Sequence, residues 1–241
     1  MSKDNIYADS ESMIVDFAFD EKVANVFPDM IRRSVPGYEA IITMIGLIAG
    51  EYAQKDSNIY DLGCSLGAAT LSMRKQLKQP GCTIIAVDNA QAMLEQCKSN
   101  LNIEQSDIKT ELVCSDVQDI EIENASVVVM NFTLQFIAPA ARFALMQKIY
   151  NGLKPSGVLI LSEKIIFAND LEQDEQESMQ LAFKKANGYS DLEISRKRTA
   201  LENVLIPDTL ELHQDRLKSV GFARSHLCFQ CFNFISLLAI K

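Results

Sequence analysis

The sequence predicts an α/β protein built on a doubly wound, mostly parallel sheet. Short apolar runs alternate with segments of helical spacing between about residues 57 and 163, the order expected of a parallel sheet covered by helices on both faces. The run Cys82–Val87 is continuously apolar, as in a strand buried on both faces. Polar residues directly follow several of these runs, where ligands bind in open sheets of this kind.

The N-terminal segment predicts an arm. Residues 1–20 mix acidic and apolar positions, with Phe17 and Phe19 near their end. We expect this arm to lie across a ligand site or a partner subunit, the alternative being a poorly ordered N-terminus. Residues 1–241 are expected to form a single domain with an N-terminal helical extension over about residues 1–56.

Helices and strands are then expected in alternation. A short helix is expected over Phe27–Arg33 with Pro28 in its first turn, and a longer one from Tyr38 to about Ala53. The expected strands are residues 57–62, 82–87, 109–114, 125–130 and 158–162, and the helices between them are residues 68–78, 90–100 and 139–153.

The pattern weakens from Phe167 to Pro207. The acidic run Asp170–Glu177 is more typical of a solvated helix face than of a site. The chain is expected to end with a helix over Asp208–Val220, stopped by Gly221, and an antiparallel pair over Phe222–Phe229 and Cys231–Ile240.

Composition limits the function. The formal net charge of −9 argues against an extended nucleic-acid-binding surface, because binding to the phosphate backbone needs a basic surface. A small anionic substrate would need a local cluster of arginine or lysine. No apolar run is long enough to span a membrane, and the first residues lack a signal-peptide core. The six cysteines are expected to be reduced thiols in the cytoplasm.

Polar residues stand at the ends of four consecutive expected strands. Because the carboxyl ends of parallel strands meet at one edge of a sheet, these residues predict a nucleoside-sized pocket there. They are Asp61 with Gly63 and Ser65, Asp88 with Asn89, Asp116, and Asn131.

Position suggests what each strand end does. Asp88, after the second strand, can accept hydrogen bonds from both ribose hydroxyls. Asp116 and the neighbouring Val117 follow the third strand, where the amino group and a ring nitrogen of an adenine could be recognised by hydrogen bonds. Asn131 would lie next to the reactive end of the ligand.

The turn after the first strand favours one ligand class over another. A dinucleotide site usually shows G-x-G-x-x-G, and the run Gly63-Cys64-Ser65-Leu66-Gly67 lacks the middle glycine. Asp61, just before the turn, would also repel a pyrophosphate. S-adenosylmethionine carries an ammonium and a sulfonium, so this acid favours it as the ligand.

These residues together resemble a known pattern. Asp61–Gly67, Val87-Asp88, Ser115-Asp116 and Gly152–Gly157 are similar to the class I S-adenosylmethionine-dependent methyltransferases over roughly residues 57–163, although Ser65 replaces the usual second glycine. The resemblance implies a Rossmann-like, seven-stranded sheet with an antiparallel C-terminal strand, which the expected terminal strand pair fits.

A narrower resemblance covers almost the whole chain. Pro36-Gly37-Tyr38, Gly63–Thr70, Asp88-Asn89, Glu193–Arg198 and Cys228–Phe234 resemble the carboxy-S-adenosyl-L-methionine synthase family. The resemblance implies an enzyme that carboxylates the methyl group of S-adenosyl-L-methionine, with prephenate as the CO2 source and phenylpyruvate as the by-product. It also implies a homodimer, and a product that another enzyme uses to modify the wobble uridine of tRNA.

The resemblance also implies site residues. A carboxylated cofactor carries a new anion, for which an arginine fork is the natural partner. Arg198 is matched to this role and Tyr38 to that of a hydroxyl donor, and both are expected to be catalytic. Whether Arg198 serves its own pocket or a neighbour's stays open. The expected cofactor-binding residues are Tyr38, Asp61, Gly63, Cys64, Ser65, Asp88, Asn89, Asp116, Val117, Asn131 and Arg198.

No general base stands out. His213 and His226 lie in the last quarter of the chain and are expected to be structural or exposed. The family chemistry needs no protein base if prephenate, on aromatising, releases CO2 and a hydroxide that takes a proton from the sulfonium methyl. Cys228-x-x-Cys231, without two further ligands, favours strand core over a metal site, and no metal is expected.

Two other functions stay open from the residues alone. One is an ordinary methyltransferase acting on a small molecule, which would yield S-adenosylhomocysteine. The other is a non-catalytic protein that stores or senses the cofactor. The polar strand ends by themselves suit all three functions.

Overall fold

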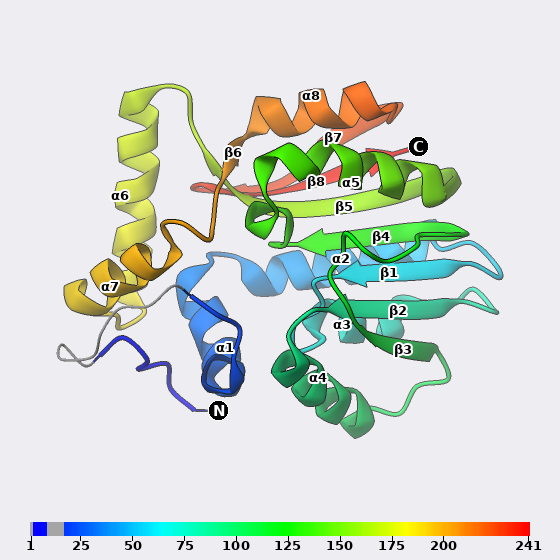
Figure 1. Cartoon of the computed structure of the whole chain (residues 1–241), viewed down its shortest axis with the longest axis horizontal. Helices are drawn as coiled ribbons and strands as arrows, with labels where there is room; N and C mark the ends of the chain where they lie inside the picture. The colour runs from blue at the N-terminus through cyan, green and yellow to red at the C-terminus, as the bar shows by residue number, and fades with distance from the viewer. Residues whose placement is uncertain (1, 9–16) are drawn as a thin grey trace.

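The computed structural model describes residues 2–8 and 17–241. Its sheet has the strand order β3-β2-β1-β4-β5-β8-β7, with a short strand, β6, paired to β5 (Figure 1). The strands are β1 Asn58–Leu62, β2 Thr83–Asp88, β3 Lys109–Cys114, β4 Ala125–Asn131, β5 Leu153–Ile166, β6 Asp208–Thr209, β7 Arg224–Cys231 and β8 Phe234–Ile240.

Strands β3, β2, β1, β4 and β5 run parallel to one another. Strand β8 is antiparallel to both β5 and β7, which confirms the mostly parallel sheet and the antiparallel terminal pair. The described helices are α1 Glu21–Ser34, α2 Tyr38–Tyr52, α3 Ala68–Gln76, α4 Gln91–Ile103, the 3-10 helix η1 Leu134–Phe136, α5 Pro139–Gly152, α6 Asp170–Ala186, α7 Asp191–Leu201 and α8 Leu210–Val220.

The centre of the sheet is buried on both faces. In β4 alternate residues belong to two apolar layers, Val128 and Met130 to the one that contains residues of α5 and α8, and Val127 and Val129 to the one that contains residues of α2 and α3. All four side chains are fully buried. These positions of β4 are all apolar because a strand covered by helices on both faces has no side that faces solvent.

Helix α1 begins earlier than the sequence predicted. Asp20 caps it by accepting a hydrogen bond from the Val23 N–H at 2.9 Å, so the helix begins at Glu21 rather than near Phe27. Pro28 therefore lies inside the helix, and the expectation that it occupies the first turn is wrong. A proline inside a helix removes one backbone hydrogen bond, and the upstream aspartate fixes the start of the helix regardless.

Two further expectations need correction. Strand β5 is much longer than residues 158–162, because Lys154–Gly157 forms an irregularity within the strand, with Ser156 at φ 61°, instead of ending it. Strand β7 lies at the edge of the sheet, so Cys228 is exposed and Cys231 only partly buried, and neither is core.

The stretch where the sequence pattern weakened forms α6 and α7. A capping box begins α7: the Glu193 N–H donates to the Ser190 hydroxyl, and the Glu193 carboxylate accepts from the Ser190 N–H at 2.8 Å. The acidic run at the start of α6 is mostly exposed, as expected of a solvated helix face. Within the described ranges no helix combines the length and the apolar character needed to cross a membrane.

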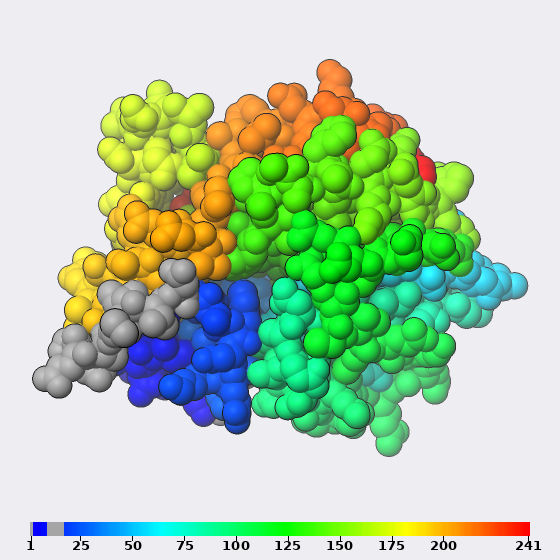
Figure 2. Space-filling model, in the orientation of Figure 1, coloured from blue at the N-terminus to red at the C-terminus, as the bar shows by residue number. Residues whose placement is uncertain are grey.

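Helices α1, α6 and α7 lie beyond the carboxyl ends of the parallel strands (Figure 1). The space-filling view shows the blue N-terminal segment and the orange segment of α7 packed against the green segments at this edge of the sheet (Figure 2). The edge at which ligands bind in open sheets is therefore walled by these helices.

Candidate active site

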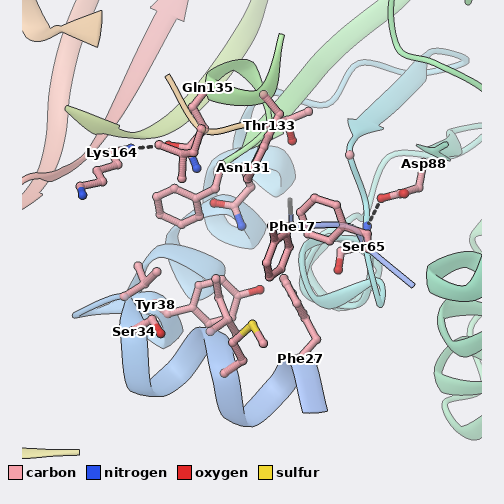
Figure 3. A pocket seen from close by; sticks show the side chains of 18 of the residues that line it. Phe17, Phe27, Ser34, Tyr38, Ser65, Asp88, Asn131, Thr133, Gln135 and Lys164 are labelled. Atoms are coloured by element: carbon pink, nitrogen blue, oxygen red, sulfur yellow. Dashed lines mark hydrogen bonds between the residues drawn. The ribbon is translucent and has the colours of Figure 1, made fainter. Parts of the chain in front are cut away.

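A cavity of about 600 Å³ lies at the carboxyl edge of the sheet. The ends of β1, β2 and β4, residues that follow β3, the segment from α1 into α2, the η1 loop, and α6 and α7 all contribute to its wall. Figure 3 shows Ser34 and Tyr38, Ser65, Asp88, Asn131, and Thr133 and Gln135 around it. Except for Arg198, every site residue expected from the sequence lines this cavity, namely Tyr38, Asp61, Gly63, Cys64, Ser65, Asp88, Asn89, Asp116, Val117 and Asn131.

The turn after β1 is held by the acid that ends β2. The Ser65 N–H donates to Asp88 Oδ2 at 2.8 Å, and the Ala90 N–H donates to Asp88 Oδ1 at 2.9 Å. Each carboxylate oxygen keeps a further lone pair for a ligand hydroxyl. Gly63 has φ 82°, and a Cβ on it would collide with Thr133, so only glycine fits there.

Asp61 is buried at the end of β1. Its Oδ2 accepts a hydrogen bond from the Thr70 hydroxyl at 2.5 Å, and its Oδ1 has no hydrogen-bond partner among the described residues. Burial raises the pKa of Asp61 to about 6, although the bonds from Thr70 work against the rise, and the charge of Asp88 adds to it. A buried acid with one oxygen unused is suited to a cationic ligand group such as the ammonium of S-adenosylmethionine.

Asn131 and Tyr38 lie on facing sides of the cavity (Figure 3). The Oδ1 atom of Asn131 is buried and unpaired within the part of the chain that the structure describes, so a ligand donor would satisfy it. Burial, and secondarily the charge of Asp61, raises the pKa of Tyr38 above its ordinary value. The Tyr38 hydroxyl therefore stays protonated and available as a donor.

The third strand end contributes an apolar and a polar wall. Val117 is buried, and Asp116 accepts the Gln118 N–H at 2.8 Å through Oδ1. This pairing of an apolar side chain with a carboxylate suits a flat, hydrogen-bonding ring such as adenine. The residues present therefore fit an adenosyl ligand with a cationic tail, as the sequence predicted.

Arg198 does not line the cavity of its own chain. It lies on α7 with its side chain 70% exposed, and its Nη2 pairs with Glu177 Oε1 at 3.0 Å. Its predicted contact with the ligand stays a prediction. The neighbouring residue, Lys197, is buried and lines the cavity instead.

Sequence reasoning missed three lysines in the cavity wall, Lys164, Lys184 and Lys197. The sequence shows the basic runs Lys184-Lys185 and Arg196-Lys197-Arg198, but the helices that carry them were not predicted. Without those helices, no helical face could be assigned to Lys184 or Lys197. Lys164 lies near the end of β5, beyond the range expected for that strand.

The described part of the N-terminal arm contacts the site. The Phe17 N–H donates to the Ala200 carbonyl at 3.0 Å, and Phe17 and Phe19 both line the cavity. The Phe19 ring lies edge-on to Phe136 of η1, with ring centroids 5.3 Å apart. Residues 17–20 therefore lie across the ligand site as expected, whereas residues 9–16 of the arm fall outside the described residues.

The histidines lie away from the cavity wall. His213 is buried on α8 beside Arg216, and burial lowers its pKa to about 4, so it is neutral and structural. His226 is on the exposed face of β7. The described residues include no group of three or more His, Cys, Asp or Glu side chains arranged to hold a metal ion.

Comparisons with known proteins show what this chain is similar to. A family model described as "Methyltransferase domain" matches residues 59–157. A carboxy-S-adenosyl-L-methionine synthase of Shewanella woodyi is 58% identical over 240 residues, covering 100% of this chain and 99% of the relative. One from Trichlorobacter lovleyi is 59% identical over 239 residues, covering 99% and 98%.

Solved structures show the same fold at low identity. The plantazolicin methyltransferase BamL, in complex with SAH, has a TM-score of 0.64 at 10% identity, covering 91% of each chain. Human N-acetylserotonin methyltransferase, in complex with SAM, has a TM-score of 0.60 at 16% identity, covering 92% of this chain and 55% of its own.

Proposed function

This chain belongs to the carboxy-S-adenosyl-L-methionine synthase family, and on that premise we propose that it converts S-adenosyl-L-methionine and prephenate into carboxy-S-adenosyl-L-methionine and phenylpyruvate. The full-length relationship carries the proposal. The cavity at the carboxyl edge of the sheet supports it, because the buried Asp61 suits a cationic cofactor and the other polar strand ends suit an adenosine.

The atoms of this reaction balance without an external base. Prephenate loses its ring carboxylate as CO2 and its ring hydroxyl as hydroxide, leaving phenylpyruvate. The hydroxide takes one proton from the sulfonium methyl and becomes water, and the methyl carbon forms a bond to CO2. The protein contributes position and exclusion of water, since free CO2 and hydroxide would otherwise escape.

Each cavity residue then has a part in binding. Asp61 forms an ion pair with the ammonium group of the cofactor, and Asp88 accepts hydrogen bonds from the ribose hydroxyls. Asp116 and Val117 hold the adenine. Tyr38 and Asn131 lie beside the sulfonium end, where Tyr38 donates to the new carboxylate. Gly63, Cys64, Ser65 and Asn89 complete the wall around the cofactor.

The proposal includes a homodimer in which Arg198 meets the new carboxylate in the partner's cavity. Arg198 is exposed and outside its own cavity. Arg198 is on α7 and pairs with Glu177 on α6. The same two helices carry exposed apolar side chains that a second chain would cover, namely Leu171 and Met179 on α6 and Leu192 on α7. Both the dimer and the catalytic part of Arg198 belong to this proposal.

Mixed dimers test the placement of Arg198. A dimer of one Arg198→Ala chain and one Asp61→Asn chain has one site with both defects and one site with neither. Mixing the two inactive variants should therefore restore part of the activity. If Arg198 acts in its own subunit, every site keeps one defect and mixing restores nothing.

We further propose that the enzyme works in the cytoplasm as one catalytic unit over residues 1–241. Its product would pass to another enzyme for wobble-uridine modification of tRNA. Direct binding of nucleic acid is not expected at a net charge of −9.

Mass spectrometry of the cofactor after incubation with prephenate tests the function. Carboxylation adds the mass of one CO2. Loss of the methyl group would instead indicate a methyltransferase, and an unchanged cofactor would indicate a binding protein.

A further inference from the structure

We propose that Lys164, Lys184 and Lys197 form the subsite that binds the carboxylates of prephenate, at the end of the cavity opposite the adenosine. The inference rests on the proposed function, because the ligand is the dianionic substrate of that reaction. It assigns a place to a substrate for which the sequence offered none.

Three separate elements bring these lysines to one cavity. Lys164 is near the end of β5, Lys184 in the last turn of α6 and Lys197 in α7, and all three line the wall. Lys197 is buried, and Lys164 and Lys184 are partly buried. In a chain with a net charge of −9, a partly enclosed cluster of three cations is a local exception that calls for an anion.

Two of the three ammonium groups have no partner among the described residues. No hydrogen bond or ion pair is formed there by the Nζ atom of Lys164 or of Lys184; the backbone N–H of Lys164 donates to Gln135 Oε1 at 3.1 Å. The Nζ of Lys197 lies 3.2 Å from Ser34 Oγ and 4.0 Å from Asp4 Oδ2. Lys197 is therefore partly compensated, whereas Lys164 and Lys184 are left for a ligand.

Burial and nearby positive charge lower the pKa values of all three lysines. Burial, together with the charges of Lys197, Lys164 and Arg198, lowers the pKa of Lys184 to about 7 against the opposing effect of Glu177. Burial likewise lowers the pKa of Lys197 to about 8 and that of Lys164 below its ordinary value. A bound dianion would reverse these shifts, so the protonated cluster and the dianion stabilise each other.

The strand order puts this subsite next to the reacting methyl group. Asp88 ends β2, Asn131 ends β4 and Lys164 lies on β5, with β1 between β2 and β4. Neighbouring strands are about 4.8 Å apart, so the step from β2 to β5 spans about 14 Å. Figure 3 shows Lys164 and Asp88 on opposite sides of the cavity with Asn131 between them. A cofactor with its ribose at Asp88 therefore points its sulfonium toward the lysines.

Carboxylates could reach the lysines from two sources, prephenate or the cofactor itself. Separate measurements for the two ligands distinguish them. Variants Lys164→Met and Lys184→Met remove one ammonium each and keep an unbranched side chain. Lys185→Met is the matched control, since Lys185 is adjacent on α6 but half-exposed and paired with Asp191 on the surface.

Calorimetry gives the Kd of S-adenosyl-L-methionine, and steady-state kinetics at saturating cofactor gives the KM of prephenate. We expect KM to rise about ten- to a hundredfold in Lys164→Met and Lys184→Met, with the cofactor Kd within about twofold of wild type. Lys184→Arg should recover part of the loss, and Lys185→Met should change neither value. The unchanged cofactor Kd also shows that each variant is folded.

Three outcomes overturn the inference. An unchanged KM of prephenate in both Met variants excludes the subsite. A higher Kd of the cofactor in both variants shows that the lysines bind the cofactor's own carboxylate. A rise in the KM of prephenate that is as large in Lys185→Met shows that only the overall charge of the protein acts on the substrate. The proposed function fails separately. Suppose that calorimetry shows prephenate binding to the wild-type chain with bound cofactor and none to the Met variants. The subsite is then supported, even if no carboxylated product forms and the proposed function is wrong.

Discussion

Asp61 and Thr70 share a short hydrogen bond, with the Thr70 hydroxyl 2.5 Å from Asp61 Oδ2, while Asp61 Oδ1 has no partner among the described residues. The bond ties the end of β1 to the first turn of α3 across the glycine turn. It leaves one carboxylate oxygen for the ligand and tunes the pH at which the acid ionises. Two predictions follow from this pair.

Cofactor binding should weaken at low pH. Because the pKa of Asp61 is about 6 in the free protein, the carboxylate is charged above that pH and neutral below it. The cationic ligand binds the charged form, so the Kd of S-adenosyl-L-methionine should rise about tenfold per unit as pH falls below 6. Calorimetry between pH 5 and 7 measures it. Asp61→Asn should bind weakly at every pH; a variant that keeps the wild-type pH dependence would exclude Asp61 as the source.

Removing the Thr70 hydroxyl should move that pH dependence upward. Thr70→Val keeps the shape of the side chain but deletes a hydrogen bond that favours the charged form of Asp61, so the pKa of Asp61 rises further. The pH at which cofactor binding begins to fail should increase by about one unit, with little change at high pH. An unmoved midpoint would show that the bond does not tune Asp61.

Prephenate binding should weaken at high pH. Lys184, with a pKa of about 7, loses its charge as pH rises from 6 to 9, so the dianion loses a partner. The groups that act on Lys184 are Lys164, Lys197, Glu177 and Arg198, of which only Glu177 favours the charged form. The KM of prephenate at saturating cofactor should therefore rise over this range. In Lys184→Met the rise should be smaller; a parallel rise in both proteins would place the titrating group elsewhere.

Glu163 should hold the η1 loop against the cavity. It is fully buried, and its two carboxylate oxygens accept the backbone N–H groups of Leu134 at 2.8 Å and Gln135 at 3.1 Å. Burial raises the pKa of Glu163 to about 8, so at pH 5, where the measurement is made, the side chain is a neutral acid whose hydroxyl oxygen can still accept a hydrogen bond. In Glu163→Gln that oxygen becomes an NH2 group that faces a backbone donor and cannot accept. The free energy of unfolding should fall by about 1–3 kcal/mol in urea titration at constant pH.

The loop reaches the cavity through Gln135 and Phe136, so the KM of prephenate should rise in the same Glu163→Gln variant. Glu51→Gln, at an exposed position near the end of α2 and outside the cavity wall, serves as the matched surface control. A Glu163→Gln protein as stable as the wild type would show that the two backbone bonds carry no net free energy.

The cofactor end of the site was predictable from sequence because parallel strands bring their carboxyl ends together. Asp61, Asp88 and Asn131 each follow an apolar run, so finding the strands also located the residues. Predicting the residues that hydrogen-bond to them, such as Thr70 with Asp61, also requires knowing which side of the following helix faces the strand end.

The other end of the site depends on helices that the apolar pattern did not reveal. Successive residues on a helix are separated by about 100° around its axis, so Lys197 can face the cavity while Arg198 faces solvent. Helix α7 is marked by its Ser190–Glu193 capping box rather than by an apolar stripe. The family resemblance assigned a role to Arg198, which stays a prediction, whereas Lys197 was missed because the helix that turns it toward the cavity had not been predicted.

Transfer of an isotopic label tests the central claim most directly. Prephenate labelled in its ring carboxylate is incubated with the enzyme and unlabelled S-adenosyl-L-methionine, and the cofactor product and phenylpyruvate are analysed by mass spectrometry. The account predicts that the cofactor gains one labelled CO2 for each unlabelled phenylpyruvate formed. An unlabelled carboxyl group, or S-adenosylhomocysteine in place of a carboxylated product, would contradict it.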